Sequence, residues 1–410
     1  VDLNVDSEEL YGPKMKRNQV FQKIIEDLDF AIQWLPEAGS EEANRLNKDI
    51  ARHVKARFCL NEGTHYKYHD ELEYASEAEK WLQMAATESD KLITSGRYEI
   101  YNTGHPQEDY FNMYRIDDKS DLKEAVLYVD YKTNIREHNM AAAGREAGCG
   151  FSKSFVESFL CSDGLPISLS NKYLGDETMR KETANRDPRL KQLILTNDFP
   201  TNVTDDLKDS TFVVNEDEFI TQHCFTGYRP IKGFNPIYSQ ALYMKSSFDG
   251  IAYRYAETLL INAEAKAELN TITNADLDRT VNQLRDRVGM PHLTVNVGFT
   301  DPKWPDWGYS LSPVLQEIRR ERCIELAGEG FRFNDLKRWK AGKLLNNVLT
   351  YVGKRKPDGN LAIVYPNYTN PDLSYQAGKS RTWEDKMYLY PIPTGELQRN
   401  PQLLPQNPGW

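Results

Sequence analysis

The sequence predicts a mainly α-helical protein, in which packed helices form a scaffold and a loop-rich lobe with short strands is inserted between them. Apolar residues recur at helical spacing in three segments before residue 96 and in further segments after residue 250. Residues 97–250 are rich in Gly, Asn, Asp and Pro, which favour turns. We therefore expect a helical scaffold at 1–96, an irregular ligand-facing lobe at 97–250, and a second helical part with a tail at 251–410.

The first three helices are expected at 18–35, 47–68 and 76–95. Apolar residues follow the i, i+3, i+4, i+7 pattern in each segment, Pro36 ends the first, and Gly96 ends the third. Small residues stand beside large ones, as is typical of closely stacked helix pairs in tetratricopeptide-like (TPR-like) arrays. This part is therefore predicted to be a TPR-like helical-pair scaffold.

The central lobe has few periodic segments. Strand-like runs occur at 98–101 and 125–131. Asp163-Gly164 and Asp187-Pro188 predict tight turns. Residues 197–238 are polar with scattered aromatic residues, so we expect side chains there to change without unfolding the scaffold.

Helices return after residue 250. They are expected at 253–265, where Glu257 and Glu264 lie away from the apolar face, and at 274–289, with Asn274 as the cap. Ser312 and Pro313 start a further helix, which Gly328 and Gly330 end before a shorter helix at 331–339.

The last two helices carry many charged side chains. Nearby arginines would hold each carboxylate ionised, which favours helix-locking ion pairs over acid–base catalysis. We expect substitution of Arg322 or Arg332 to lower stability. The residues concerned are Arg319, Glu321, Arg322, Glu325, Glu329, Arg332 and Asp335.

Composition excludes several classes of function. A formal net charge of −10 over 410 residues argues against a nucleic-acid binder, which needs clustered Lys and Arg. The five cysteines are scattered without a CxxC or Cys/His cluster, so we expect no zinc site. The sequence also has no Gly-rich phosphate loop and no spaced metal cluster, so we expect no metal ion and no cofactor. His65 and His69 have the spacing of a metal pair, but Tyr66 occupies the glutamate position of a His-Glu-x-x-His motif, and a polar helix end is favoured.

Six motifs in order resemble one family, the SusD/RagB-type nutrient-binding outer-membrane lipoproteins of Bacteroidota. The resemblance covers nearly the whole chain, and its specificity comes from the combination. The motifs are the Asp-Gly-x-Pro turn at 163–167, the Arg-Asp-Pro-Arg segment at 185–190, the helical signature at 253–265, Asn-x-x-Arg-x-Arg-x-Gly at 282–289, the charged pair of helices at 317–339, and the proline-punctuated tail at 390–410.

The resemblance implies a SusD-like fold and a function in binding without catalysis. Such proteins bind an oligosaccharide at the cell surface, attached to the outer membrane by a lipid anchor, and deliver it to a SusC-like TonB-dependent transporter. Members also begin with a lipid-modified cysteine and an N-terminal helical part that this sequence does not match, so we expect a C-terminal portion. The alternatives are a peptide-binding member and a glycoside hydrolase, whose paired carboxyl groups would lie roughly 5–9 Å apart.

Loop aromatic residues are the candidate ligand contacts. Pyranose rings present apolar C–H faces that pack on Trp or Tyr, and loops on a rigid scaffold carry function. No residue carries over from the family by motif, and no catalytic residue is expected. The candidates are Tyr173, Phe225 and Tyr228 in the lobe, Trp304, Trp307 and Tyr309 in the 298–312 loop, and Tyr365, Asn367 and Tyr368 near the tail.

Overall fold

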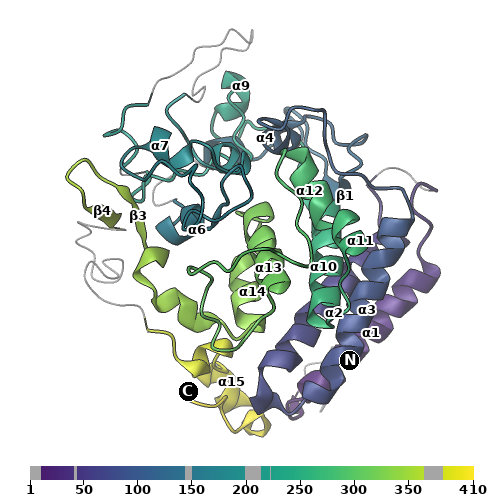
Figure 1. Cartoon of the computed structure of the whole chain (residues 1–410). Coiled ribbons are helices and arrows are strands. Elements are labelled where there is room, and N and C mark those ends of the chain that lie inside the picture. Colours follow the sequence, from purple (N-terminus) through teal and green to yellow (C-terminus); the bar gives the residue numbers. More distant parts are fainter. Residues whose placement is uncertain (1–10, 41–43, 144–149, 199–213, 222, 364–381) are drawn as a thin grey trace.

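The computed structural model is mainly helical and describes residues 11–40, 44–143, 150–198, 214–221, 223–363 and 382–410 (Figure 1). The mainly α prediction is therefore confirmed. Within these ranges, no helix combines the length and the apolar character needed to cross a membrane.

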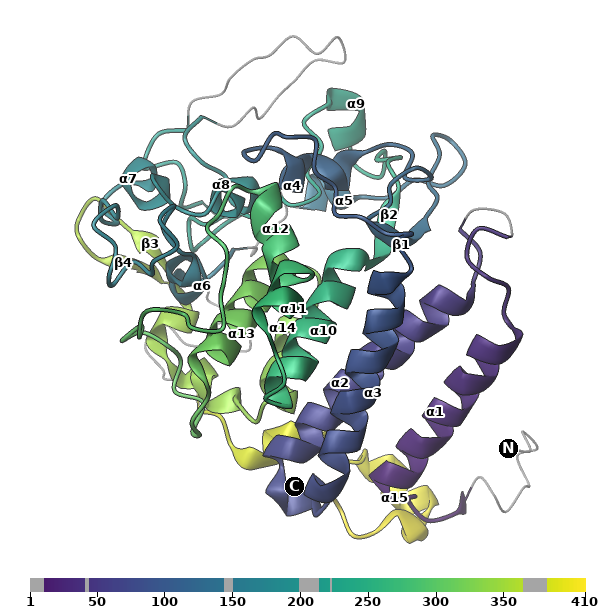
Figure 2. The same cartoon turned by 45° about the vertical axis from the view of Figure 1, so that its right-hand side comes forward.

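The three N-terminal helices are α1 (Arg17–Trp34), α2 (Lys48–Tyr68) and α3 (Ala75–Thr94), as predicted. They lie side by side in Figure 2. Phe21 of α1 meets Trp81 of α3 edge to face, with ring centroids 4.8 Å apart. The Asn47 side chain caps α2 by accepting hydrogen bonds from the Asp49 and Ile50 amides.

Helix α10 (Tyr255–Glu268) joins the two ends of the chain into one scaffold, because it packs against α2 and α3 on one side and against α13 (Pro313–Glu325) on the other. The Asn262 side chain donates to the Ala86 carbonyl oxygen at 3.0 Å. Glu257 and Glu264, expected outside the apolar face, are buried as well, each with an arginine partner. The exact boundaries of the three expected regions stay a prediction.

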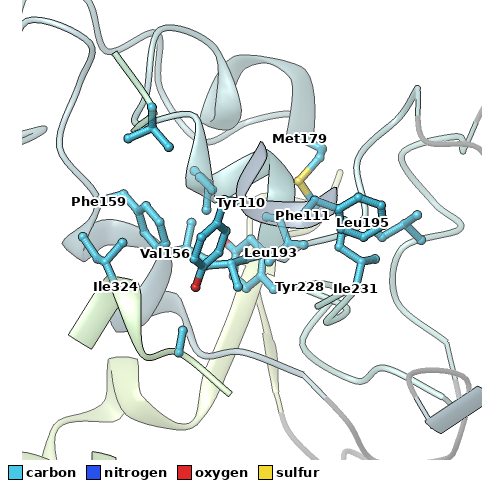
Figure 3. Packing of buried hydrophobic residues seen from close by; sticks show 14 of the residues in the cluster. Tyr110, Phe111, Val156, Phe159, Met179, Leu193, Leu195, Tyr228, Ile231 and Ile324 are labelled. Atoms are coloured by element: carbon cyan, nitrogen blue, oxygen red, sulfur yellow. The ribbon is translucent and has the colours of Figure 1, made fainter. Parts of the chain in front are cut away.

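The central lobe contains short helices around one apolar cluster. Figure 3 shows Tyr110, Phe159, Leu193 and Tyr228 within that cluster, together with Ile324 of α13. The lobe is therefore packed directly on the scaffold. Its helices are α4 (Asp109–Asn112), α5 (Met140–Ala143), α6 (Lys153–Ser158), α7 (Met179–Thr183), α8 (Arg189–Leu193) and α9 (Tyr238–Ala241).

Two small antiparallel sheets accompany the helices. Strand β1 (Ala125–Val129) pairs with β2 (Gly250–Arg254), and β3 (Val352–Arg355) pairs with β4 (Leu361–Ile363). The strand expected at 98–101 is wrong, because the Tyr101 amide donates to the Glu124 carboxylate at 2.7 Å rather than to a neighbouring strand.

The segment expected as one helix at 274–289 forms two, α11 (Asn274–Asp278) and α12 (Val281–Arg287). The expected cap, Asn274, is also wrong. Thr273 caps α11 in a capping box with Asp276, which satisfies two backbone amides. The Asn274 side chain instead accepts a hydrogen bond from the Val295 amide at 2.8 Å.

Helix α13 begins as expected, with Ser312 as its cap and Pro313 in its first turn. Gly328 and Gly330 adopt φ values of +74° and +84° in the turn that follows, a conformation that favours glycine. Helix α14 (Arg332–Arg338) follows, and α15 (Thr394–Arg399) lies in the tail.

Ion pairs lock these helices together around Glu325, which is fully buried on α13. Arg287 of α12 donates to both carboxylate oxygens of Glu325 at 2.7 and 2.6 Å, Arg254 of β2 donates at 2.6 Å, and Arg189 of α8 donates at 3.0 Å. Burial alone would raise the pKa of Glu325, but the guanidiniums of Arg287, Arg254 and Arg189 hold that pKa well below its ordinary value.

A second group of ion pairs joins α14 to α10. Arg338 donates to both oxygens of Glu264 at 2.6 and 2.8 Å, and Arg322 donates to Asp335 at 3.0 Å. The expectation that the charged helices lock one another is confirmed for Arg322 and wrong for Arg332. Arg332 is exposed and pairs with no carboxylate of the described chain, because the buried face of α14 begins only at Asp335.

Replacement of the central carboxylate tests this network. Glu325→Gln keeps the side-chain shape but leaves three buried guanidiniums facing a neutral amide. We expect its free energy of unfolding to fall by about 3–5 kcal/mol. Chemical denaturation would measure the change. Glu396→Gln is the control, because its pair with Arg399 is exposed and contributes little. A Glu325→Gln protein as stable as the control would contradict the structural role.

Acid should destabilise the protein through Glu257. Burial alone would raise its pKa, but His53 and Arg57 lower the pKa of Glu257 to about 2, against an ordinary value of 4.5. A carboxyl group whose folded pKa is depressed stabilises the fold above its unfolded pKa, and that stability is lost as the pH falls through the folded value. We therefore expect a decline from about pH 4.5 towards pH 2. The decline should be shallower in Glu257→Gln when thermal unfolding is followed across this range, whereas equal slopes would contradict the assignment.

Candidate functional site

Two of the sequence-predicted residues are buried. Tyr228 is 0% exposed in the lobe cluster (Figure 3). Its hydroxyl donates to Glu182 at 2.8 Å. Trp307 is 5% exposed; its indole N–H donates to Gln316 at 2.6 Å, and its ring meets Trp339 edge to face. In this structure neither ring has an open face on which a sugar could stack.

Four other candidates are half-buried. The Trp304 indole N–H donates to Glu317 at 2.7 Å. Tyr309 stacks on Tyr68 with centroids 4.4 Å apart, and its hydroxyl donates to the Trp339 carbonyl oxygen. The Tyr173 ring lies 5.3 Å from the Arg186 guanidinium, and Phe225 is half-buried.

The remaining three candidates, Tyr365, Asn367 and Tyr368, lie outside the described residues. Among the others, Tyr228 and Trp307 belong to separate buried clusters. Packing and polar contacts already occupy most of the residues that the sequence suggested.

Exposed apolar and aromatic side chains gather elsewhere, on a surface that we call the α9 patch. Tyr243 is 74% exposed and Tyr238 is 60% exposed. The members of the α9 patch are Ile135, Met140, Tyr238, Leu242, Tyr243 and Met244.

Backbone pairing brings the two halves of the α9 patch together. His138 and Ser246 exchange two backbone hydrogen bonds of 2.9 and 3.1 Å, and the Met244 amide donates to the Asn139 side chain at 3.1 Å. Helices α5 and α9 contact each other, and both lie in the upper part of the molecule (Figure 2). The α9 patch is therefore carried by two paired segments, 131–140 and 238–250.

Sequence reasoning missed the α9 patch because its composition resembles that of a core. Ala241, Leu242, Tyr243 and Met244 are four consecutive apolar residues, which a sequence pattern assigns to the interior. One signal could have indicated exposure. Apolar residues recur every three or four positions in an amphipathic helix and every second position in a half-buried strand, and these four consecutive residues follow neither pattern. Ala241 is buried, whereas Leu242, Tyr243 and Met244 are exposed, and three consecutive exposed apolar residues are unusual unless they serve a function.

A cavity of about 730 Å³ meets the α9 patch at Met140. Arg57 and Phe58 of α2, Tyr114, Lys232, and Phe331 of the α13–α14 turn also line it. The scaffold already uses its charged groups, since Arg57 pairs with Glu257 and Lys232 pairs with Glu329. Burial lowers the pKa of Lys232 to about 8.

The two histidines that have metal-pair spacing pack against each other. The His65 and His69 rings stack at 4.0 Å, and burial lowers the pKa of His65 to about 2. The two nitrogens of His69 contact the Glu71 carboxylate at 2.9 Å and the Lys337 carbonyl oxygen at 2.8 Å. In the described part of the chain, no three His, Cys, Asp or Glu side chains are grouped so as to hold a metal ion.

Known proteins share both the motifs and the fold. The profile of the SusD family matches residues 87–410. A curated relative, SusD-like protein P2 of Formosa agariphila, is 24% identical over 97% of this chain and 66% of its own length. The present chain thus spans slightly less than two thirds of that relative.

Solved structures agree with this fold. A SusD-like protein from Bacteroides fragilis has a TM-score of 0.68 at 24% identity, covering 97% of this chain and 72% of its own. A SusD-like carbohydrate binding protein from the same species has a TM-score of 0.67 at 22% identity, covering 98% and 74%. Because the family profile matches well over half of the sequence and the fold agrees, this chain belongs to the SusD family.

Proposed function

We propose that the protein binds an oligosaccharide through the α9 patch. The observation that carries the proposal is the exposure of Tyr238 and Tyr243 on the 238–250 segment, which is hydrogen-bonded to the 131–140 segment. Tyrosine offers a flat apolar face and a polar tip, which match the C–H face and the hydroxyl groups of a pyranose. Membership of the SusD family, and the structural likeness to a SusD-like carbohydrate binding protein of Bacteroides fragilis, support a glycan ligand.

The bound glycan is delivered, uncleaved, to a SusC-like TonB-dependent transporter. The protein acts at the outward face of the outer membrane, held there by a lipid anchor. Family membership supports this part of the proposal. The absence of catalysis is supported by the carboxylates of the charged helices, since Glu264, Glu325 and Asp335 are buried and paired with arginines. A general acid needs a raised pKa, whereas those of Glu325 and Asp335 are lowered.

Removal of a tyrosine ring from the α9 patch tests the binding surface. Each of Tyr238→Ala and Tyr243→Ala should weaken binding to a retained polysaccharide about three- to ten-fold, because one aromatic contact contributes about 0.5–1.5 kcal/mol. The melting temperature should stay unchanged, since both rings are largely exposed. Affinity electrophoresis across a polysaccharide panel, followed by calorimetry with the retained glycan, would measure the effect.

The matched control is Tyr390→Ala. This ring is 70% exposed in the C-terminal tail, close in sequence to α15, which lies at the opposite end of the molecule from α9 (Figure 1). Binding as tight in both patch variants as in the wild type, or an equal loss in the control, would place the glycan elsewhere. If the unmodified protein retained peptides and no glycan, the peptide-binding alternative would replace the proposal.

The purified protein should release no reducing sugar from any polysaccharide that it binds. The buried carboxylates of Glu325 and Asp335 are engaged in ion pairs with arginines, which leaves these two groups unsuited to proton donation. A reducing-end assay after long incubation, with an active polysaccharide hydrolase as the positive control, would check this. Turnover that scales with protein concentration would show that the protein is an enzyme.

A further inference from the structure

We propose that the glycan bound at the α9 patch is acidic, carrying carboxylate or sulfate groups, and that Lys132 and Arg136 recognise those groups. This inference rests on the proposed function and names the class of its ligand. It starts from two exposed cations that stand beside the α9 patch in a chain whose net charge is −10.

Lys132 and Arg136 lie at the base of one tight turn. The Lys132 amide donates to the Arg136 carbonyl oxygen at 2.9 Å, and the Arg136 amide donates back to the Lys132 carbonyl oxygen at 2.9 Å. Asn134 adopts a φ of +63° within the turn, and Ile135, a member of the α9 patch, is 76% exposed there. The two cations and an exposed apolar side chain therefore share one short segment.

That turn is fixed to the segment that follows the tyrosines, just before β2. The Thr133 hydroxyl donates to the Ser247 hydroxyl at 3.1 Å, and His138 pairs with Ser246. Lys245 forms an ion pair with Glu137 at 3.0 Å across the same two segments. The cations and Tyr243 thus belong to one hydrogen-bonded unit, which can present charge and aromatic surface together.

Neither cation is neutralised by the protein. Most basic side chains near α13 are paired with carboxylates, whereas Lys132 and Arg136 form no ion pair with any described carboxylate. The Arg136 guanidinium instead lies 5.0 Å from the centre of the Tyr131 ring, a cation–π contact that leaves its N–H groups available. Charge-assisted hydrogen bonds to carboxylate or sulfate oxygens are the natural use of such a group.

The 730 Å³ cavity is a weaker place for an acidic group. Its Arg57 and Lys232 already contact Glu257 and Glu329, so an added anion would have to compete with buried carboxylates. The turn at 132–136 has no such competition, because Glu137 is engaged by Lys245 and by the Asn134 amide. Charge complementarity therefore favours the exposed turn.

Matched pairs of polysaccharides test this inference. The probes are polygalacturonate with its carboxyl-reduced product, and carrageenan with its desulfated product, each used in affinity electrophoresis. We expect stronger retention by the acidic member of at least one pair, and the responding pair distinguishes carboxylate from sulfate. Raising NaCl from about 0.05 to about 0.5 M shortens the Debye length roughly three-fold. This change should weaken retention of the acidic polysaccharide and leave retention of its neutral product unchanged.

Substitutions assign the effect to the two side chains. Lys132→Gln and Arg136→Gln should each weaken binding of the acidic probe by about two- to five-fold, as expected for exposed ion pairs, and should leave the melting temperature unchanged. Arg136→Lys should restore part of the loss. The control is Lys343→Gln, which removes one exposed positive charge from the 3₁₀ helix Gly342–Asn346. An equal loss in the control would mean non-specific charge attraction and would overturn the assignment.

The outcomes separate this inference from the proposed function. Equal retention of the acidic and neutral members, with binding still lost in Tyr243→Ala, would overturn the acidic class and leave glycan binding in place. Failure to retain any polysaccharide would overturn glycan binding, and the ligand class with it.

Discussion

One buried carboxylate, that of Glu325, fixes how the lobe sits on the scaffold. Its guanidinium partners come from α8 in the lobe, from β2 and from α12, while Glu325 itself belongs to α13. An isolated charge in this interior would be very costly, so no member of the group is stable there unless its partners are in place. Apolar packing brings these elements together, and the ion pairs define their mutual orientation.

Strand β2 connects the 238–250 half of the α9 patch to this arrangement. Strand β2 starts at Gly250, just after the tyrosine segment, and ends at Arg254, which donates to Glu325. Nine residues, 245–253, therefore separate Met244 of the patch from Arg254 of the ion network, and β1 pairs with the β2 part of this connection. The segment that carries the tyrosines is therefore restrained by the paired strand that follows it. This restraint reduces the conformational entropy that the protein loses when a ligand binds.

Helical spacing predicted most of the scaffold, because that spacing directly reflects burial on one side of a helix. It could not predict that Thr273 rather than Asn274 caps α11, since both residue types cap helices. It also did not indicate which aromatic rings are exposed. Tyr228 appears in a polar loop segment, yet Glu182 accepts its hydroxyl in the core, while the apolar run ending at Met244 is exposed. Which aromatic ring reaches solvent depends on pairing between distant segments, which a local pattern does not record.

The central position of α10 has a consequence for the order of folding. Its Asn262 bonds to Ala86 across 176 residues, so the apolar faces of α2 and α3 are not covered until the chain beyond residue 260 has joined them. Contacts of such high sequence separation slow folding, because the loop-closure entropy is lost before the contact is gained. During synthesis, the apolar faces of α2 and α3 that α10 covers in the folded protein therefore stay exposed to solvent until the lobe and α10 have been made.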